Sequence, residues 1–283
     1  MTRFDRNVRL FGKEGQRKLR EAKVAVVGVG GLGSHVVQQL ALLGVGGLYL
    51  VDGEQISTSN KNRYVGVRDD DPVPGTDKVD AALRLALSID PSIKVVAIPN
   101  SLISAGAFSA VRNADYVFGC LDSDGPRFVL NDVSTAYAKP YLDLASDVVE
   151  GSFGGRVVFK TEAPGCLFCF GELDQAEVQT FLESPADRLN RRAAYGIERA
   201  HLNRAGPSVV SINGVIASLA VTEFMIACTE LGAPKQFINY QGERARCAER
   251  IFSARLGCPY CGQWNSGDRA DTARYLRATF AEA

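Results

Sequence analysis

Histidine is nearly absent from this sequence, since His35 and His201 are the only two among 283 residues. Chemistry that depends on a histidine general base therefore has very few places to occur. An excess of either charge is also missing, because 32 basic residues balance 32 acidic ones. The overall charge thus indicates neither a nucleic acid nor an anionic membrane as a partner, and we expect neither.

Long hydrophobic runs and a secretion signal are lacking too. The most apolar stretch, residues 208–231, is helix-like but interrupted by polar residues, which argues against a membrane span of roughly 18–20 residues. The first 23 residues are charged throughout and have no apolar signal-peptide core. We therefore expect a cytoplasmic protein. In that compartment the seven cysteines favour metal binding or burial over disulfides.

What the chain does contain is a βαβ pattern. Continuous apolar runs at 23–28 and 47–52 are typical of strands buried on both faces, and between them apolar residues recur at helical spacing. Further strands are predicted at 93–99, 115–122, 140–145 and 155–161, helices from near 76, over 124–138 and over 208–231, a hairpin from 236–242 and 246–252, and loops at 53–76 and 172–207.

These elements predict an α/β fold, a Rossmann-like, doubly wound and mostly parallel sheet. Without repeats or low-complexity linkers, we expect one domain over 1–283. Its nucleotide-binding half would be 1–150, and residues 151–265 would carry a crossover segment and a partner-binding half. A C-terminal tail would follow at 266–283.

The first strand runs directly into a glycine cluster, Gly28-x-Gly30-x-x-Gly33. Alone, this pattern also fits a tight turn without a ligand, but a strand before it and a helix after it favour a nucleotide site. Asp52, at the end of the second strand, is placed to bind ribose hydroxyls. This arrangement fits NAD and ATP equally well.

Four cysteines form two Cys-x-x-Cys pairs, CLFC (Cys166 and Cys169) and CPYC (Cys258 and Cys261). Either pair alone could be a redox pair. Two matched pairs far apart in sequence predict a closed, structural zinc site that would pin a C-terminal lobe to the core. The other three, Cys120, Cys228 and Cys247, are expected to be buried, inert thiols.

Polar residues follow the predicted strand ends. Each of them alone would ordinarily be a solvated surface residue; together with the glycine loop they indicate a phosphate site. Arginine and lysine there can neutralise a triphosphate, and a carboxylate can hold Mg²⁺. The set comprises Arg6, Asn60, Arg63, Lys78 and Asp122.

In this order the motifs resemble those of the ThiF/MoeB/HesA-type adenylating enzymes, whose fold is shared with the enzymes that activate ubiquitin. The resemblance runs from FDRNVRLFG through KVAVVGVGGLGS, YLVDGEQISTSNKNRY, GTDKV and GCLDS to CLFC and CPYC. It implies ATP rather than NAD.

The resemblance also implies residue roles. Gly28, Gly30, Gly31 and Gly33 would form the phosphate loop, Asp52 would bind ribose, Asn60, Arg63 and Lys78 would contact phosphates, Asp122 would hold Mg²⁺, and Arg6 would reach the nucleotide of a partner subunit. The active enzyme would then be a homodimer.

The reaction implied is attack of a C-terminal carboxylate on the α-phosphate of ATP, with pyrophosphate leaving. The substrate would be a ubiquitin-like or sulfur-carrier protein ending in Gly-Gly. Many relatives carry a cysteine in the crossover loop for a thioester, but residues 191–214 contain none. Cys228 lies in the apolar helical stretch and is a poor nucleophile there. We therefore expect adenylation without a thioester on this loop.

Three alternatives remain open. The first is adenylation of another substrate, such as a peptide carboxylate or a tRNA base. The second is an NAD(P)-dependent oxidoreductase, which would leave Arg63, Lys78 and the cysteine pairs unexplained. The third is a scaffold that has lost the chemistry, which the presence of Arg63, Lys78 and Asp122 disfavours.

Overall fold

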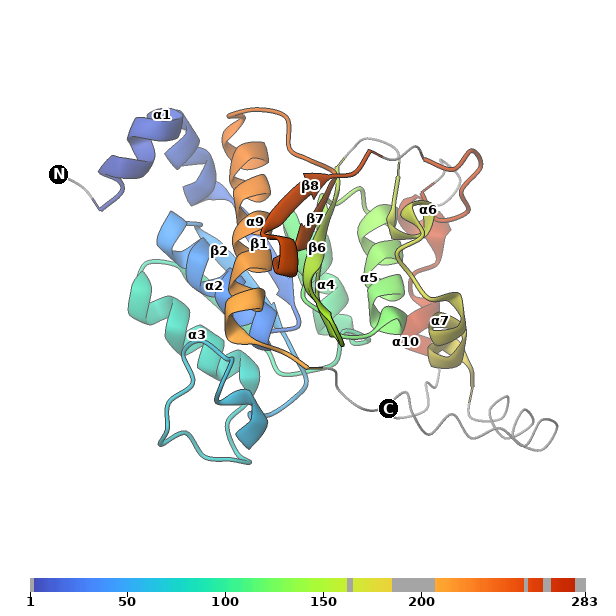
Figure 1. Ribbon diagram of the computed structural model, residues 1–283, viewed down its shortest axis with the longest axis horizontal. Coiled ribbons are helices and arrows are strands. Elements are labelled where there is room, and N and C mark those ends of the chain that lie inside the picture. Colours follow the sequence, from blue (N-terminus) through green and yellow to red (C-terminus); the bar gives the residue numbers. More distant parts are fainter. Residues whose placement is uncertain (1–2, 162–164, 185–206, 252–253, 262–265, 278–283) are drawn as a thin grey trace.

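A single sheet contains all eight strands of the residues that the computed structural model describes, which are 3–161, 165–184, 207–251, 254–261 and 266–277. The strand order is β3-β2-β1-β4-β5-β6-β7-β8 (Figure 1). The first five are parallel and the last three antiparallel. Their bounds are β1 Lys23–Val27, β2 Gly47–Val51, β3 Lys94–Ile98, β4 Tyr116–Gly119, β5 Tyr141–Val149, β6 Ser152–Lys160, β7 Phe237–Gln241 and β8 Arg246–Glu249.

Helices cover both faces of this sheet. One face carries α1 (Asp5–Glu21), α2 (Gly31–Leu43), α3 (Lys78–Ile89) and α9 (Val210–Thr229), and the other carries α4 (Ala105–Asn113), α5 (Asp124–Ala136) and α6 (Leu167–Phe170) (Figure 1). α7 (Gln175–Leu182) packs on α5. Short pieces are η1 (Thr58–Asn60), η2 (Gly242–Arg244), η3 (Gly267–Ala270) and α10 (Arg274–Arg277). The predicted doubly wound α/β class is confirmed.

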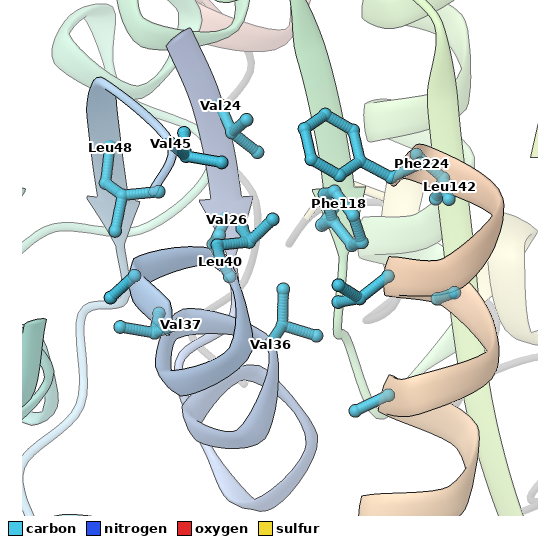
Figure 2. Packing of buried hydrophobic residues seen from close by; sticks show 14 of the residues in the cluster. Val24, Val26, Val36, Val37, Leu40, Val45, Leu48, Phe118, Leu142 and Phe224 are labelled. Carbon is cyan, nitrogen blue, oxygen red and sulfur yellow. The ribbon is translucent and has the colours of Figure 1, made fainter. Parts of the chain in front are cut away.

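The two hydrophobic layers meet at β1, which explains why its sequence is apolar without interruption. Val24 and Val26 face the cluster around α2 and α9, whereas Ala25 and Val27 face the cluster around α4 and α5. In Figure 2, Phe224 of α9 lies against Phe118 of β4, with ring centroids 5.7 Å apart. Burying side chains of this size contributes roughly 1.5–3 kcal/mol each, so this layer holds α9 firmly on the sheet.

Several elements differ from the sequence prediction. α1 and α4 were not predicted. β5 and β6 extend further because they pair with each other from Tyr141↔Lys160 to Val149↔Ser152. The prediction of a loop over 172–207 is wrong at α7, which Asp174 caps by accepting hydrogen bonds from the amides of Ala176 and Glu177. Residues 185–206 of that prediction lie outside the described residues, and the division of 1–283 into halves stays a prediction.

α9 is apolar enough to raise the question of a membrane. By length and composition it could span one, with a mean hydropathy of 1.7 over its most apolar window. That window is 44% buried inside the protein, and α9 packs on β5, β6, α1 and α2. Such packing is what a core helix of a soluble protein shows, so the composition of α9 is weak evidence for a span.

Candidate functional site

The glycine turn after β1 is fixed by close packing at two positions. Gly28 has a φ of +83°, and a Cβ there would lie 2.6 Å from the carbonyl oxygen of Cys120. A Cβ at Gly33 would lie 2.0 Å from the carbonyl oxygen of Gly28. Only glycine fits at these two points, because the turn must pass directly between β4 and the start of α2.

The other two glycines lie at the start of α2 and differ in the space around them. Apart from its chain neighbours, no atom of the described residues lies within 4 Å of a Cβ placed on Gly30, the N-cap, which offers no side-chain cap. A Cβ on Gly31 would lie 2.6 Å from Asn213 Nδ2 and 3.3 Å from Arg63 Cδ. Gly30 therefore borders open space, while Gly31 packs against Asn213 and Arg63. The first amides of a helix lack partners within the helix, and such a helix end attracts phosphate.

Asp52 follows β2 and is bound to the glycine turn. Its Oδ2 accepts a hydrogen bond from the amide of Val29, and its Oδ1 accepts one from the amide of Glu54, both at 2.9 Å. Burial raises the pKa of Asp52, while the nearby Lys78 acts in the opposite direction. The carboxylate is thus held at the edge of the turn, where it can accept hydrogen bonds from ribose hydroxyls.

Lys78 is a buried cation at an unfavourable place. It is the first residue of α3, where the helix dipole disfavours positive charge, and its side chain is 9% exposed. Its Nζ donates to the exposed carboxylate of Glu54, and its carbonyl accepts a hydrogen bond from Tyr64 at 2.6 Å. Local stability does not explain a lysine at this position, whereas an anionic ligand at the neighbouring helix end of α2 does.

Arg63 and Asn60 come from the long loop after β2. The stem of Arg63 packs on Gly31, and its guanidinium donates to the carbonyl of Ser59. No carboxylate among the described residues pairs with it. Asn60 is buried and uses Oδ1 to cap η1 by accepting from Ser57. Arg63 is therefore a cation beside the glycine turn that lacks an acidic partner among the described residues, and Asn60 shapes the loop that presents it.

Asp122 stands on the opposite side of the turn. It follows β4 by three residues and is exposed, without a polar partner among the described residues. The preceding residues touch the glycine turn, since Leu121 Cδ2 lies 3.5 Å from a Cβ on Gly28. The structure thus brings Asp52, Lys78, Arg63 and Asp122 to one edge of the sheet, around the start of α2.

Arg6 does not join this group within one chain. It is exposed on α1, two residues after Phe4, whose ring would contact a Cβ on Gly44 at 2.5 Å. Gly44 caps the far end of α2, a helix of 13 residues. That length is about 20 Å, which places Arg6 far beyond side-chain reach of its own glycine turn.

Two residues at the site were not predicted from the sequence. Asn213 of α9 is buried, donates from Nδ2 to Ser208 Oγ at 3.0 Å, and keeps Oδ1 without a partner in the part of the chain that the structure describes. Glu54 holds Lys78. The sequence does give a sign of Asn213, because an asparagine inside the apolar run 208–231 has to find polar neighbours.

The four predicted zinc ligands are brought together. The Sγ atoms of Cys166, Cys169, Cys258 and Cys261 all lie within 4.8 Å of one another, and three of the pairs are 3.5–3.9 Å apart. Four sulfurs around a tetrahedral zinc, each at 2.3 Å, would be about 3.8 Å apart. Burial raises the pKa of Cys166 and Cys261, so a cation is needed to keep these groups as thiolates. The donor set fits zinc.

The remaining cysteines differ from the prediction at one position. Cys228 is buried and its pKa is raised to about 11 by burial, which supports its exclusion as a nucleophile. Cys120 is half-buried, and burial of its thiol also raises its pKa. The prediction that Cys247 is buried is wrong, since it lies exposed on the edge strand β8, where no further strand covers it.

Comparison with known proteins gives a family match and several relatives. A family model described as the ThiF family matches residues 4–259. The chain is 29% identical over 270 residues to the protein HesA, heterocyst, of Trichormus variabilis, covering 93% of this chain and 89% of that protein. It is 34% identical over 169 residues to the adenylyltransferase and sulfurtransferase MOCS3-1 of Zea mays, covering 59% of this chain and 35% of that protein.

Solved structures share the fold at low sequence identity. E. coli MccB with MccA-N7isoASN superposes with a TM-score of 0.72 at 21% identity, covering 93% of this chain and 75% of that one. E. coli MccB with ATP gives a TM-score of 0.68 at 21% identity, with the same coverage. At this identity the likeness establishes the fold.

Proposed function

The chain belongs to the ThiF family of adenylyltransferases, and we propose that it uses ATP to adenylate the C-terminal glycine carboxylate of a ubiquitin-like or sulfur-carrier protein. The observation that carries the proposal is the charge arrangement around the start of α2. Two cations, Arg63 and Lys78, and an exposed carboxylate, Asp122, lie around the first turn of α2. This is a site for binding and neutralising phosphate. The alternative of an oxidoreductase is set aside by the family.

The proposed step is a displacement at phosphorus. A carboxylate oxygen of the substrate bonds to the α-phosphorus of ATP as the bond to the bridging oxygen breaks, which gives an acyl-adenylate and pyrophosphate. The attacking carboxylate is already ionised at pH 7, so no general base is needed. The enzyme's task is alignment and neutralisation of charge, which suits a chain with two histidines.

Each residue has a definite part in that task. The amides at the start of α2 would bind phosphate, with Gly30 leaving the room for it, and Asp52 would hold the ribose hydroxyls. Lys78 would exchange its contact with Glu54 for a phosphate oxygen, and Arg63 would leave the carbonyl of Ser59. Mg²⁺, held by Asp122, would screen the triphosphate charge.

The zinc site would stabilise the C-terminal lobe. All four thiolates are used, so no position stays open for catalysis. Zinc would join Cys258 and Cys261, near the end of the chain, to the pair that follows β6. The chemistry of adenylation does not pass through this site.

A homodimer explains the position of Arg6. In one chain Arg6 lies beyond the far end of α2, so a catalytic contact requires a second copy that presents its α1 to this site. Mixing the variants Arg6→Ala and Lys78→Met tests this arrangement. In a mixed dimer one site has both residues, so random mixing should restore about a quarter of wild-type activity. No recovery would mean that Arg6 does not act across an interface.

The fate of the adenylate follows from the cysteines. Cys228 is buried, and residues 191–214 of the crossover loop contain no cysteine. The exposed Cys247 lies on β8 and not on that loop. We therefore propose that the activated carboxylate passes directly to another protein, to sulfide or to an amine, in the cytoplasm. Mass spectrometry of the reaction at neutral pH, before and after a thiol reductant, should show no thioester-linked enzyme.

ATP–pyrophosphate exchange with Mg²⁺ tests the main proposal. The assay compares an intact ubiquitin-fold protein ending in Gly-Gly with the same protein lacking its last two residues. Exchange that requires the intact end supports the proposal. If ATP binds but no Gly-Gly protein in a broad panel supports exchange, the carrier assignment is wrong, and peptide carboxylates and tRNA are tested in the same assay.

A further inference from the structure

The loop that carries Asp122 is held on both sides, although its carboxylate has no polar partner among the described residues. On one side the carbonyl of Leu121 accepts two hydrogen bonds from Arg127, at 3.1 Å from Nε and 2.8 Å from Nη2. On the other side the amide of Asp124 donates to Glu177 Oε1 at 2.8 Å. Charged groups therefore fix the backbone immediately before and after Asp122–Ser123.

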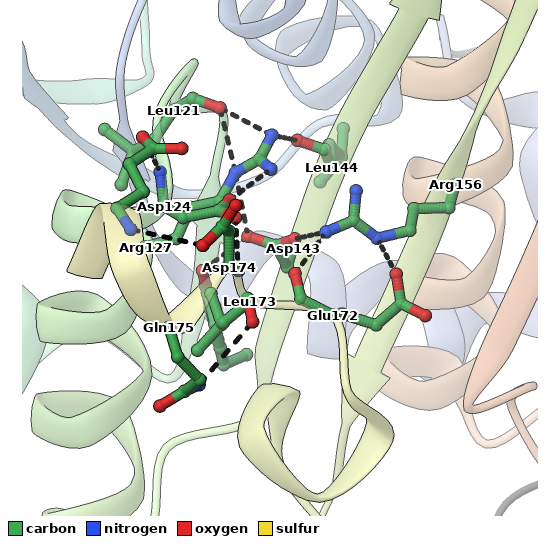
Figure 3. Close-up of polar contacts among 12 residues, drawn as sticks. Leu121, Asp124, Arg127, Asp143, Leu144, Arg156, Glu172, Leu173, Asp174 and Gln175 are labelled. Carbon is green, nitrogen blue, oxygen red and sulfur yellow. Dashed lines mark hydrogen bonds and ion pairs between the residues drawn. The ribbon is translucent and has the colours of Figure 1, made fainter. Parts of the chain in front are cut away.

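Arg127 is buried within a network that keeps its guanidinium in place (Figure 3). Its Nη1 donates to Asp124 at 3.2 Å and its Nη2 to the carbonyl of Leu144 at 3.3 Å, while Nε lies 3.8 Å from the fully buried carboxylate of Asp143. Asp143 also accepts a hydrogen bond from Tyr141 at 2.8 Å. Arg127 thus joins the segment after β4 to the first half of β5 with charge-assisted contacts.

Glu177 comes from a distant part of the chain. It lies on α7, which is docked on the start of α5 by two further contacts. The amide of Asp174 donates to Asp124 Oδ2 at 2.7 Å, and Phe181 covers Gly125, where a Cβ would lie 2.3 Å from the ring. The segment after the first cysteine pair is therefore attached to the loop that carries Asp122.

We propose that Arg127 and Glu177 are positioning residues that hold the carboxylate of Asp122 where it binds the metal of MgATP. This inference rests on the function proposed for Asp122. An exposed side chain without partners is located by its backbone alone, and here two charged groups restrain that backbone. Hydrogen bonds to charged groups are stronger than those between neutral groups, so two of them can keep a loop in one conformation.

The test compares Glu177→Ala with Glu223→Ala. Glu223 makes the same kind of contact, accepting the amide of Lys235 at 2.7 Å, but it lies on α9, which packs on the opposite face of the sheet. Amide hydrogen exchange is measured by mass spectrometry over 120–126, and ATP–pyrophosphate exchange is measured across a Mg²⁺ titration. Glu177→Ala should speed exchange in that segment and raise the half-saturating Mg²⁺ concentration at least about threefold.

Two further variants separate positioning from general stability. Glu177→Gln keeps a neutral acceptor and should restore part of the Mg²⁺ affinity. Arg127→Lys keeps a buried cation but loses the fork that binds Leu121, so it should shift the Mg²⁺ dependence as Glu177→Ala does. At saturating Mg²⁺ the rate of Glu177→Ala should return to within about twofold of wild type, because the phosphate cations are intact.

The experiments test the positioning role of Glu177 and the adenylation activity separately. Equal shifts in Glu177→Ala and Glu223→Ala, or unchanged hydrogen exchange over 120–126, would overturn the positioning role while leaving adenylation intact. If the wild-type protein gives no pyrophosphate exchange, adenylation fails, and the hydrogen exchange of that segment still decides whether Glu177 restrains the loop.

Discussion

Replacing Lys78 by Met separates a catalytic role of this cation from a structural one. Met keeps most of the buried aliphatic stem and removes only the charge. The ion pair that disappears has an exposed partner, Glu54, and such pairs contribute about 0.2–1 kcal/mol. Removing a cation from the first turn of α3 also removes its unfavourable interaction with the helix dipole, which stabilises the folded protein by roughly 0.3–1 kcal/mol. These terms nearly cancel, so the melting temperature should move by less than about 4 °C.

The expected loss of activity is much larger. A preorganised cation that meets charge developing on a transferring phosphate contributes about 10²-fold or more to the rate. This corresponds to at least about 2.7 kcal/mol of transition-state stabilisation. Lys78 also lowers the pKa of Asp52. In Lys78→Met the pKa of Asp52 should therefore be higher. As the pH is lowered, Asp52 should become protonated sooner, so the loss of ATP affinity should begin at a higher pH than in the wild type.

The assay is ATP–pyrophosphate exchange, with melting temperature and ATP affinity measured on the same samples. Lys61→Met is the matched control, because Lys61 lies in the loop that precedes α3 and its Nζ donates to the carbonyl of Asp69 at 2.7 Å. It should keep activity within about twofold of wild type. A loss of less than tenfold in Lys78→Met, or an equal loss in Lys61→Met, would refute the role given to Lys78.

The remaining predictions concern the turn, the zinc site and pH. Gly33→Ala should destabilise the protein by about 1–3 kcal/mol in urea unfolding, because its Cβ meets the backbone of Gly28; Gly30→Ala should fold as wild type but bind ATP more weakly by calorimetry, since its Cβ enters open space. The purified protein should contain one equivalent of zinc by elemental analysis, and Cys258→Ser should release it and lower the melting temperature; purified protein without zinc would contradict the assignment of this site. Burial alone would raise the pKa of Asp90, but hydrogen bonds from neighbouring donors lower it to about 2. Ionised Asp90 should therefore contribute about 2 kcal/mol above pH 5, lost as pH falls towards 2, and urea unfolding of Asp90→Asn should lack this part of the pH dependence.

Much of the fold and the site could be predicted because it depends on local patterns. The uninterrupted apolar run of β1 can be buried only between two layers, and Gly28 and Gly33 mark a turn too tight for a side chain. The matching spacing of the two cysteine pairs predicts that they bind one metal ion together, even though 88 residues separate Cys169 from Cys258. The prediction that Cys247 is buried failed, because its exposure depends on β8 being an edge strand of the sheet, and the order of strands in the sheet cannot be seen in the sequence.

Other parts of the site exist only through tertiary contacts. Asn213, Glu177 and Arg127 belong to no spacing pattern; they matter because α9 approaches Gly31 and α7 docks on the start of α5. By itself, the sequence determined the glycine turn after β1, the residue types around it and the cysteine pairs, since these depend on backbone geometry and ligand chemistry. Only the tertiary structure decided which distant side chains hold that turn and the Asp122 loop in place, because long-range packing sets those contacts.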